Sequence, residues 1–374
     1  MQLCFVKTVS YYLKFSVKNG GCIMKKILLV LLSISLCISL GTSPAFALDN
    51  SDSSAEAVVS EDTMINYLIT AGYPLSVIQS LNEVAISEIY YGQYEYQTSS
   101  VIYGIFTEDY NITYELDNSG NVIIDTDNLL QFNELLNDED AINKISADKD
   151  HAFECRKAMN RSQDYYINDS GLQSNISSRD AAIRSLSNWY ATLTINKISQ
   201  SNTKLEKSII YAWNWFYAPV WNLTDKPAVA WSKDFTLDPN STTWAYKAWG
   251  DLGYDVTGGS RRTTRTWSGT GCTEYQPDCG FGQSIDIRFE FDSNGWTYRT
   301  YEHGGSISGR LTKYLVGSEQ GAQNIASAVG RYYHKQVGIT GTLGFSKSGP
   351  SISISWASSY DPSPDTGAQF NFYQ

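Results

Sequence analysis

Three charged side chains share one face of an alternating segment, Ser284–Phe291, in which every second residue is apolar. Asp286, Arg288 and Glu290 point the same way if this segment is a strand, and residues two apart on a strand lie about 7 Å apart. Paired carboxylates at about that distance can hydrolyse glycosidic bonds. The same alternation is typical of a solvated strand face with cross-strand charge pairs, and we favour this second interpretation.

Glu302-His303-Gly304-Gly305 is the string that looks most like part of an enzyme. A His-Gly-Gly run can form an oxyanion pocket beside a nucleophile elbow, but the chain contains neither G-x-S-x-G nor H-E-x-x-H. We therefore expect a turn at the two glycines, with His303 at its rim. His334 has no supporting motif, and the chain has three histidines in all, so we expect no metal site. Without a P-loop or a dinucleotide fingerprint, we expect no cofactor.

Two cysteines, Cys272 and Cys279, flank a short segment that contains Pro277 and is bordered by glycines. In a secreted protein this spacing predicts a local disulfide that closes a loop. Cys155 has no obvious partner in the mature chain.

The aromatic residues of the second half form the strongest feature of the sequence. Tyr211, Trp213, Trp215 and Tyr217 alternate, so a strand here carries four aromatic side chains on one face. We expect most tryptophans to fill a core, but ten are many for one core. Some are therefore expected at the surface, where they can stack on sugar rings or lie at a membrane interface. The candidate contact residues are Trp213, Trp215, Trp221, Trp231, Trp244 and Trp249.

The N-terminal segment has the features of a secretory signal peptide. Lys25 and Lys26 precede an apolar run, Ile27–Leu40, and an A-x-A pattern ends at Ala47. We expect cleavage between Ala47 and Leu48, and translation from Met24 rather than Met1. The expected product is secreted and soluble.

Charge divides the mature chain into two parts. Residues 48–180 carry six basic and 24 acidic side chains, whereas residues 181–374 carry 17 basic and 15 acidic ones and all ten tryptophans. This asymmetry predicts an acidic domain at 48–160, a polar linker at 161–180 and a Trp-rich domain at 181–374. The net charge of −11 argues against a nucleic-acid partner.

The hydrophobic pattern predicts an α+β fold. Helices are expected after Ser60 and after Pro74, followed by strands at 100–106, 111–116 and 122–125 and helices within 129–145. The second part reads as an antiparallel all-β sandwich or barrel-like domain with hairpin turns at Asp292–Gly295 and Lys347–Pro350. One short helix is expected there, because Ala322, Ile325, Ala326 and Val329 recur at helical spacing.

The last hairpin, Gly338–Ser346 with Ser351–Trp356, alternates small or polar residues with large apolar ones. Membrane-inserting hairpins need one apolar and one small polar face. Ordinary half-exposed strands show the same alternation, and we favour that interpretation.

The string from Tyr211 to Phe235 combines an aromatic strand, Pro219, Thr224-Asp225 and Trp231. In these features it resembles secreted proteins of Gram-positive bacteria that are grouped with the large geobacillin-type bacteriocins. The resemblance covers about 25 residues. It implies a secreted antibacterial protein without established catalytic residues.

Three functions follow from these patterns. The first is an antibacterial or membrane-active protein whose β domain is restrained by the acidic part. The second is a β-sandwich module that binds cell wall or carbohydrate. The third, ranked last, is a hydrolase that uses Asp286, Glu290 or Glu302. The expected partner is the bacterial cell envelope or a polysaccharide, and the sequence does not indicate an oligomeric state.

Overall fold

The computed structural model describes residues 59–117, 121–157, 177–217, 219, 222–232, 235–254, 260–316, 325–336, 340–346 and 349–371, without the side chains of 153–157, 253, 254 and 260. All of them belong to one compact unit, Val59–Gln374. Its described part consists mostly of antiparallel sheet with a few helices and contains no closed barrel, which confirms a broadly α+β fold. The expected leader, its cleavage position at Ala47 and Leu48, and positions 161–176 of the expected linker lie outside the described residues.

Three short helices open the described chain: α3 (Glu61–Thr70), α4 (Leu75–Ser80) and α5 (Glu83–Gly92). The Ser60 side chain caps α3, and Gly72 ends it with a φ of 88° that favours glycine. The amide of Tyr73 then donates to the carbonyl of Leu68, which closes the helix end. Both predicted helix starts, at Ser60 and Pro74, are confirmed.

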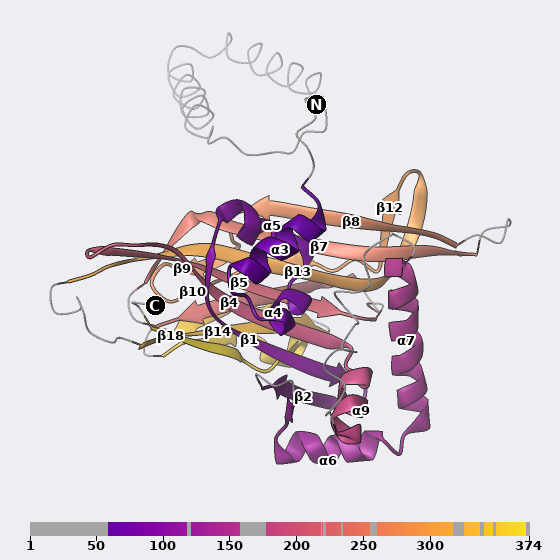
Figure 1. The fold of residues 1–374 in the computed structure, drawn as a ribbon. Helices are drawn as coiled ribbons and strands as arrows, with labels where there is room; N and C mark the ends of the chain where they lie inside the picture. Colours follow the sequence, from indigo (N-terminus) through magenta and orange to yellow (C-terminus); the bar gives the residue numbers. More distant parts are fainter. Residues whose placement is uncertain are drawn as a thin grey trace, which may run out of the picture. The chain divides into compact units, whose positions relative to one another are not determined.

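The rest of the acidic part forms strands and helices in the predicted order. β1 (Glu95–Phe106), β2 (Asn111–Leu116) and β3 (Val122–Ile123) pair in sequence. α6 (Thr126–Leu135), α7 (Glu139–Lys157) and α9 (Ser178–Leu186) follow, and their apolar side chains pack with β1 and β2 around Ile105, Ile112 and Phe132. In Figure 1, α7 runs along the end of the sheet formed by β7 and β13, which it contacts.

The first sheet has the order β3-β2-β1-β4-β5-β13-β7-β8, with β12 paired to β13. Its long strands are β4 (Trp189–Gln200), β5 (Lys204–Trp215), β7 (Thr236–Tyr254), β8 (Ser260–Thr270) and β13 (Trp296–Tyr314), beside the short β12 (Glu290–Ser293). β1 pairs with β4, with Ile102 opposite Ala191. The sheet therefore runs across the joint that charge composition suggests. A two-residue turn at Asn294-Gly295 joins β12 to β13, as predicted.

The second sheet has the order β17-β14-β6-β10-β9, with β18 paired to β14 and β11 to β6. Its strands are β6 (Thr224–Trp231), β9 (Glu274–Gln276), β10 (Gly280–Gly282), β11 (Ile285–Asp286), β14 (Ile325–Lys335), β17 (Tyr360–Pro362) and β18 (Thr366–Asn371). A short 3-10 turn, η4 (Ala357–Ser359), precedes β17.

The short helix expected near Ala322–Val329 is wrong for its described part, because residues from Ile325 onward form strand β14. This strand is buried on both faces: Ala326 and Tyr332 face the first sheet, whereas Val329 and Tyr333 lie in a separate apolar cluster on the other side. A strand that is apolar on both faces does not alternate, so its spacing resembled that of a helix.

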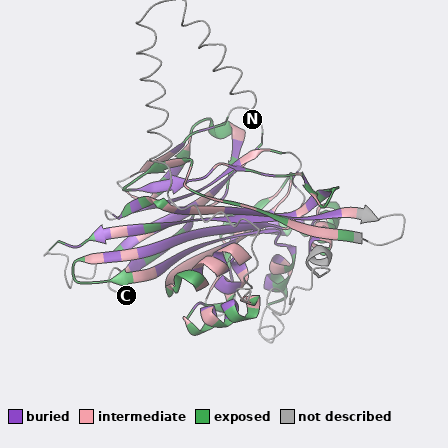
Figure 2. Ribbon diagram, turned by 90° about the horizontal axis from the view of Figure 1, so that it is seen from above, coloured by how far each residue is buried: buried purple, intermediate pink, exposed green. Residues whose placement is uncertain are grey.

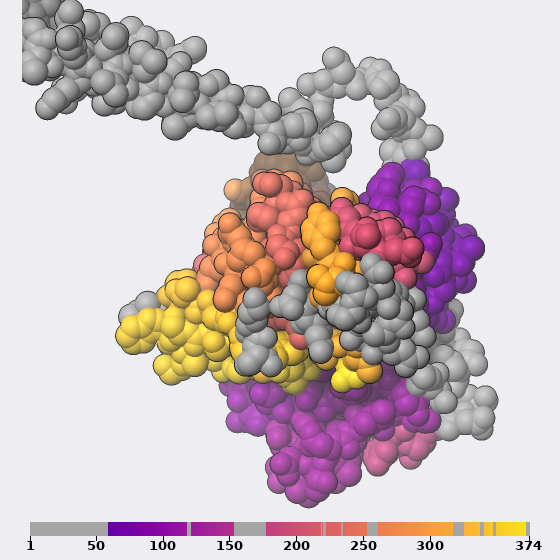
Figure 3. Space-filling view, turned by 90° about the vertical axis from the view of Figure 1, so that its left-hand side faces the viewer, coloured from indigo at the N-terminus to yellow at the C-terminus, as the bar shows by residue number. Residues whose placement is uncertain are grey.

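The main core lies between the two sheets. Trp213 of β5 and Tyr332 of β14 meet there, with ring centroids 5.2 Å apart. Figure 2 shows the long strands buried along most of their length. A separate two-stranded sheet, β15 (Leu343–Ser346) with β16 (Ser351–Ile354), packs on the opposite face of the second sheet and matches the predicted last hairpin. Figure 3 shows the C-terminal residues, in yellow, gathered on one part of the surface.

Candidate functional site

The tryptophans expected to contact a ligand or a membrane are mostly buried. Trp213 and Trp231 are fully buried in the core between the sheets, and Trp215 is nearly so. Trp249 is also buried, but it lies on the other face of β7, beside Lys247. Trp244 is partly buried, and Trp221 lies outside the described residues. As folded, the four buried indoles cannot touch a partner. Trp213, Trp215 and Trp231 belong to the core between the sheets, which agrees with the expectation that most tryptophans fill a core. Among the tryptophans that the structure describes, Trp296 and Trp356 are exposed.

The carboxylates considered for hydrolysis lie on three different strands, in two sheets. Asp286 lies on β11 of the second sheet and accepts a hydrogen bond from the Thr224 hydroxyl at 2.7 Å. Glu290 lies on β12 of the first sheet, opposite Arg299. Glu302 is buried and accepts a hydrogen bond from the Asn214 amide at 3.0 Å. The favoured interpretation of Asp286 and Glu290 as exposed strand residues agrees with their exposure.

The disulfide expected between Cys272 and Cys279 is not formed in this structure. Cys279 lies in the turn of the β9–β10 hairpin, whereas Cys272 lies at its open end, where Thr273 and Ser284 hydrogen-bond to each other. Five residues of extended chain from position 279 to 284 span about 16 Å. A disulfide requires its Cα atoms within about 7 Å.

The β15–β16 hairpin is the most distinctive candidate element. Leu343 pairs with Ile354 and Phe345 with Ile352, so the four apolar side chains share one face. That face packs on Ala228 and Ala230 of β6 and on Val329 of β14. The opposite face carries small residues, namely Gly344, Ser346, Ser351 and Ser353. The hairpin pairs with no other described strand.

Two glycines of β10 provide the seats for this hairpin. A Cβ on Gly282 would overlap with the Leu343 side chain, and a Cβ on Gly280 would overlap with the Phe345 ring. The Gly-Phe-Gly sequence of β10 therefore leaves two slots that the hairpin side chains occupy. Because neither glycine has a positive φ, their role is to leave this space rather than to form a turn.

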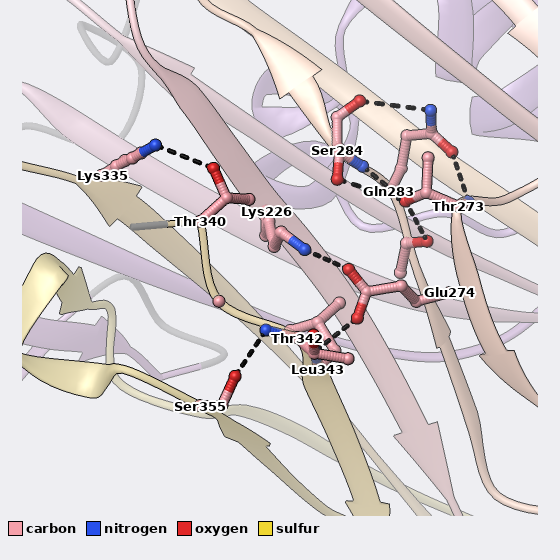
Figure 4. A network of polar contacts seen from close by, with 12 residues as sticks. Lys226, Thr273, Glu274, Gln283, Ser284, Lys335, Thr340, Thr342, Leu343 and Ser355 are labelled. Atoms are coloured by element: carbon pink, nitrogen blue, oxygen red, sulfur yellow. Dashed lines mark hydrogen bonds and ion pairs between the residues drawn. The ribbon is translucent and has the colours of Figure 1, made fainter. Parts of the chain in front are cut away.

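An ion pair holds the same hairpin through its backbone. Glu274 of β9 accepts from the Lys226 ammonium group with one carboxylate oxygen and from the Leu343 amide with the other (Figure 4). The Lys226 side chain is 3% exposed and that of Glu274 is 18% exposed, so the pair is largely desolvated. The Lys335 ammonium group donates to the Thr340 hydroxyl at 2.9 Å near the start of the hairpin.

Further contacts anchor the second strand of the hairpin. The carbonyl of Ile352 accepts from the Tyr333 hydroxyl at 3.0 Å and from the Arg331 guanidinium group at 3.1 Å. The Ser355 hydroxyl accepts from the Thr342 amide at 2.7 Å, just beyond the paired residues. Apolar packing against β6 and β14 adds to these contacts.

Three consecutive side chains at the start of β6 connect the hairpin seat to the core. Thr224 donates to Asp286, and Lys226 donates to Glu274, both on the side away from the first sheet. Asp225 points between the sheets. Its carboxylate accepts from the Lys335 amide at 2.8 Å, from the Tyr332 hydroxyl, and bonds to His334 Nδ1 at 2.9 Å.

The surroundings of Asp225 shift the pKa values of two histidines in opposite directions. Burial alone lowers the pKa of His334, but the Asp225 carboxylate outweighs it and the net shift is upward. Burial and the nearby His334 lower the pKa of His303 to about 3, so His303 is neutral at ordinary pH. An Asp–His pair can orient a general base, but the described residues place no hydroxyl or thiol nucleophile in hydrogen-bond contact with His334.

Sequence reasoning missed this site, although part of its signal was present. Thr224 and Asp225 belong to the string that carries the resemblance, and no sequence motif marks Lys226. Three polar residues in succession at the start of an otherwise apolar strand, TDKPAVAW, are the usable signal.

No model of a known protein family matches the chain, and no curated protein matches it. None of the described helices is long and apolar enough to cross a membrane. Nor do the described residues group three or more Asp, Glu, His or Cys side chains in a way that could hold a metal ion.

Proposed function

We propose that this chain is a secreted, membrane-active antibacterial protein, and that the β15–β16 hairpin is the element that enters the target envelope. The observation that carries the proposal is the way the hairpin packs on the second sheet. It is a separate two-stranded sheet whose apolar face is held in two glycine slots and by the Lys226–Glu274 pair. Such a hairpin can leave its seat without breaking the hydrogen-bond ladder of either large sheet.

The chemistry of the hairpin suits the surface layer of a bilayer. Leu343, Phe345, Ile352 and Ile354 form one apolar face, and serines with one glycine form the other. Each strand has four paired residues, whereas a membrane-spanning strand needs about 9–11. The hairpin is therefore expected to enter the interface rather than to cross the bilayer. Trp356 lies two residues after the end of β16 and is 61% exposed, which suits an interfacial anchor.

The aromatic strand has a supporting role in this proposal. Trp213, Trp215 and Trp231 fill the space between two sheets that we interpret as a β-sandwich. A rigid scaffold allows the hairpin to open while the rest of the molecule stays folded. The secreted location and the envelope as partner remain part of the proposal, supported by the leader pattern Ile27–Ala47.

The proposal is tested by growth inhibition and dye leakage with Gram-positive cells, using residues 48–374. We expect the double variant Leu343→Ser, Ile352→Ser to lose most of the leakage, because it removes half of the apolar face. The matched control, Ser351→Ala with Ser353→Ala, changes the exposed face and is expected to behave as the unaltered protein. Full leakage from a folded Leu343→Ser, Ile352→Ser variant would overturn the proposal.

A second candidate function is binding of cell-wall or other carbohydrate. It is favoured by Trp296, which is 51% exposed at the β12–β13 turn and has the Arg261 guanidinium group 4.9 Å from its ring centroid. An exposed indole of this kind can stack on a sugar ring. Retention on peptidoglycan without leakage, lost in Trp296→Ala, would select this function instead.

A further inference from the structure

The second inference concerns the three helices α3–α5, Glu61–Gly92, which we call the helical cover. They lie on the outer face of the first sheet, over β1, β4, β5 and β13 (Figure 1). We propose that the helical cover is a pH-dependent lid, docked in acid and loosened at neutral pH, with Glu88 as the group that responds. This proposal concerns docking alone and does not depend on the membrane activity proposed above.

The helical cover has an apolar core that is largely its own. Its buried members run from Met64 to Ile89, and the first sheet adds the buried Ile210 and Ala212 and the partly buried Tyr96 and Val101 of β1. The cluster under α6 and α7 differs, because Ile105, Ile112, Tyr114 and Val122 of the sheet are mixed with the helix residues there. Lifting the helical cover therefore uncovers fewer buried apolar residues of the sheet than lifting α6 and α7 would.

The sheet face beneath the cover is polar. Outward-facing residues on β4 include Thr192, Thr194 and Asn196, and those on β5, β13 and β7 include Ser208, Ser308 and Thr243. A face of hydroxyl and amide side chains is typical of a sheet surface that tolerates water. The sequence of this face therefore matches a surface that is exposed for part of the time.

Polar contacts connect the cover to this face. The Tyr73 hydroxyl donates to Asn196 Oδ1 at 2.7 Å, and Glu83 accepts from the Lys247 ammonium group. Glu88 of α5 accepts from the Thr243 hydroxyl at 3.3 Å, and Thr243 is itself 2.7 Å from the Ser308 hydroxyl. Of these contacts, the one at Glu88 places a carboxylate against hydroxyl groups.

The charged and titratable groups around Glu88 are already engaged elsewhere. On β7, Lys247 bonds to Glu83. On β13, Arg310 bonds to the Tyr94 hydroxyl, whose own pKa is raised by burial and by the charge of Glu88. Burial raises the pKa of Glu88, and the hydroxyls of Ser308 and Thr243 offset only part of this effect.

The direction of the pH effect follows from the raised pKa of Glu88. A carboxyl group with a higher pKa in the docked state binds its proton more tightly when docked. The contribution of Glu88 to docking is therefore complete below the ordinary glutamate pKa. It is lost as the pH rises through the pKa that Glu88 has in the docked state. The Glu83–Lys247 pair keeps the cover from separating fully once Glu88 is ionised.

The test is hydrogen exchange on the full mature chain at about pH 5 and about pH 7.5, corrected for intrinsic rates. Peptides from 61–92 are expected to lose protection at the higher pH, by up to about tenfold for each unit of pKa difference, relative to peptides from β5. Glu88→Gln should remove this pH dependence and keep the cover protected. Glu108→Gln, at an exposed carboxylate outside the cover, is the matched control and should leave it unchanged.

Two outcomes would overturn the proposal. One is equal protection of 61–92 at both pH values in the unaltered chain, which needs no variant to fold. The other is an undiminished pH dependence in Glu88→Gln. Neither result bears on leakage from vesicles, so this proposal and the proposed function can fail separately.

Discussion

Leu343 occupies the space that a side chain on Gly282 would need. The two residues come from a hairpin strand and from β10, which are separated by about 60 residues in the sequence and do not pair. A missing Cβ on one strand thus creates the seat for an apolar side chain on another. A substitution at Gly282 can therefore displace the hairpin without changing the sequence of the hairpin itself.

Gly282→Ala is expected to push the hairpin from its seat. The backbone at Gly282 suits alanine, so the added methyl group acts mainly by overlap with Leu343, with lesser crowding against Ala228 and the Pro227 carbonyl, at a cost of about 1–3 kcal/mol. Hydrogen exchange should show lost protection in 343–354 and unchanged protection in β5. Gly367→Ala, where a Cβ meets nothing within 4 Å, is the control. Equal protection of 343–354 in both variants would show that the slot does not hold the hairpin.

Lys226→Met is expected to destabilise the molecule and the hairpin together. It leaves the largely buried Glu274 carboxylate without its cation, at a cost of about 3 kcal/mol. Urea unfolding measures this loss. The double change Lys226→Met, Glu274→Gln should recover part of it, because no unpaired charge remains. A double variant less stable than Lys226→Met would contradict the pairing.

His334 is expected to make stability depend on pH. Its pKa is raised in the folded state because Asp225 outweighs the effect of burial, so its contribution is complete below the ordinary histidine value of about 6.5. This contribution is lost as the pH rises through the pKa of His334 in the folded protein. Urea midpoints should therefore fall less between about pH 6 and about pH 9 in His334→Gln than in the unaltered protein. Parallel curves would show that the Asp225–His334 contact does not carry a charge.

Buried and exposed tryptophans are expected to respond differently to truncation. Trp213→Ala removes a fully buried ring from the core and should cost about 3–5 kcal/mol. Trp296→Ala removes a half-exposed ring and should change stability by about 0.5 kcal/mol or less. Thermal unfolding separates the two. A large loss in Trp296→Ala would mean that this ring is structural and would remove it as a candidate sugar platform.

Local features of the fold were predictable where residues close together in the sequence determine them. Ser60 caps a helix, and Asn294-Gly295 forms a two-residue hairpin turn, because each depends on neighbouring residues alone. The last hairpin was predictable for the same reason. Burial of both faces concealed strand β14, since its apolar residues do not alternate.

The candidate site was less predictable because its contacts are distant in sequence. Asp225 and His334 are 109 residues apart, and Glu274 joins Lys226 to Leu343 across two more strands. Likewise, β1 pairs with β4 although charge composition places a division between them. Charge asymmetry reports on the solvent-facing side chains and says little about which backbones pair.

The most direct test of the proposed function is dye release from anionic phospholipid vesicles, comparing the unaltered mature chain with Gly282→Ala and Gly367→Ala. If the hairpin is the membrane-entering element, unseating it should raise the rate of release for Gly282→Ala severalfold, and Gly367→Ala should match the unaltered chain. Equal rates for all three, with the hairpin shown by hydrogen exchange to be unseated in Gly282→Ala, would contradict the account.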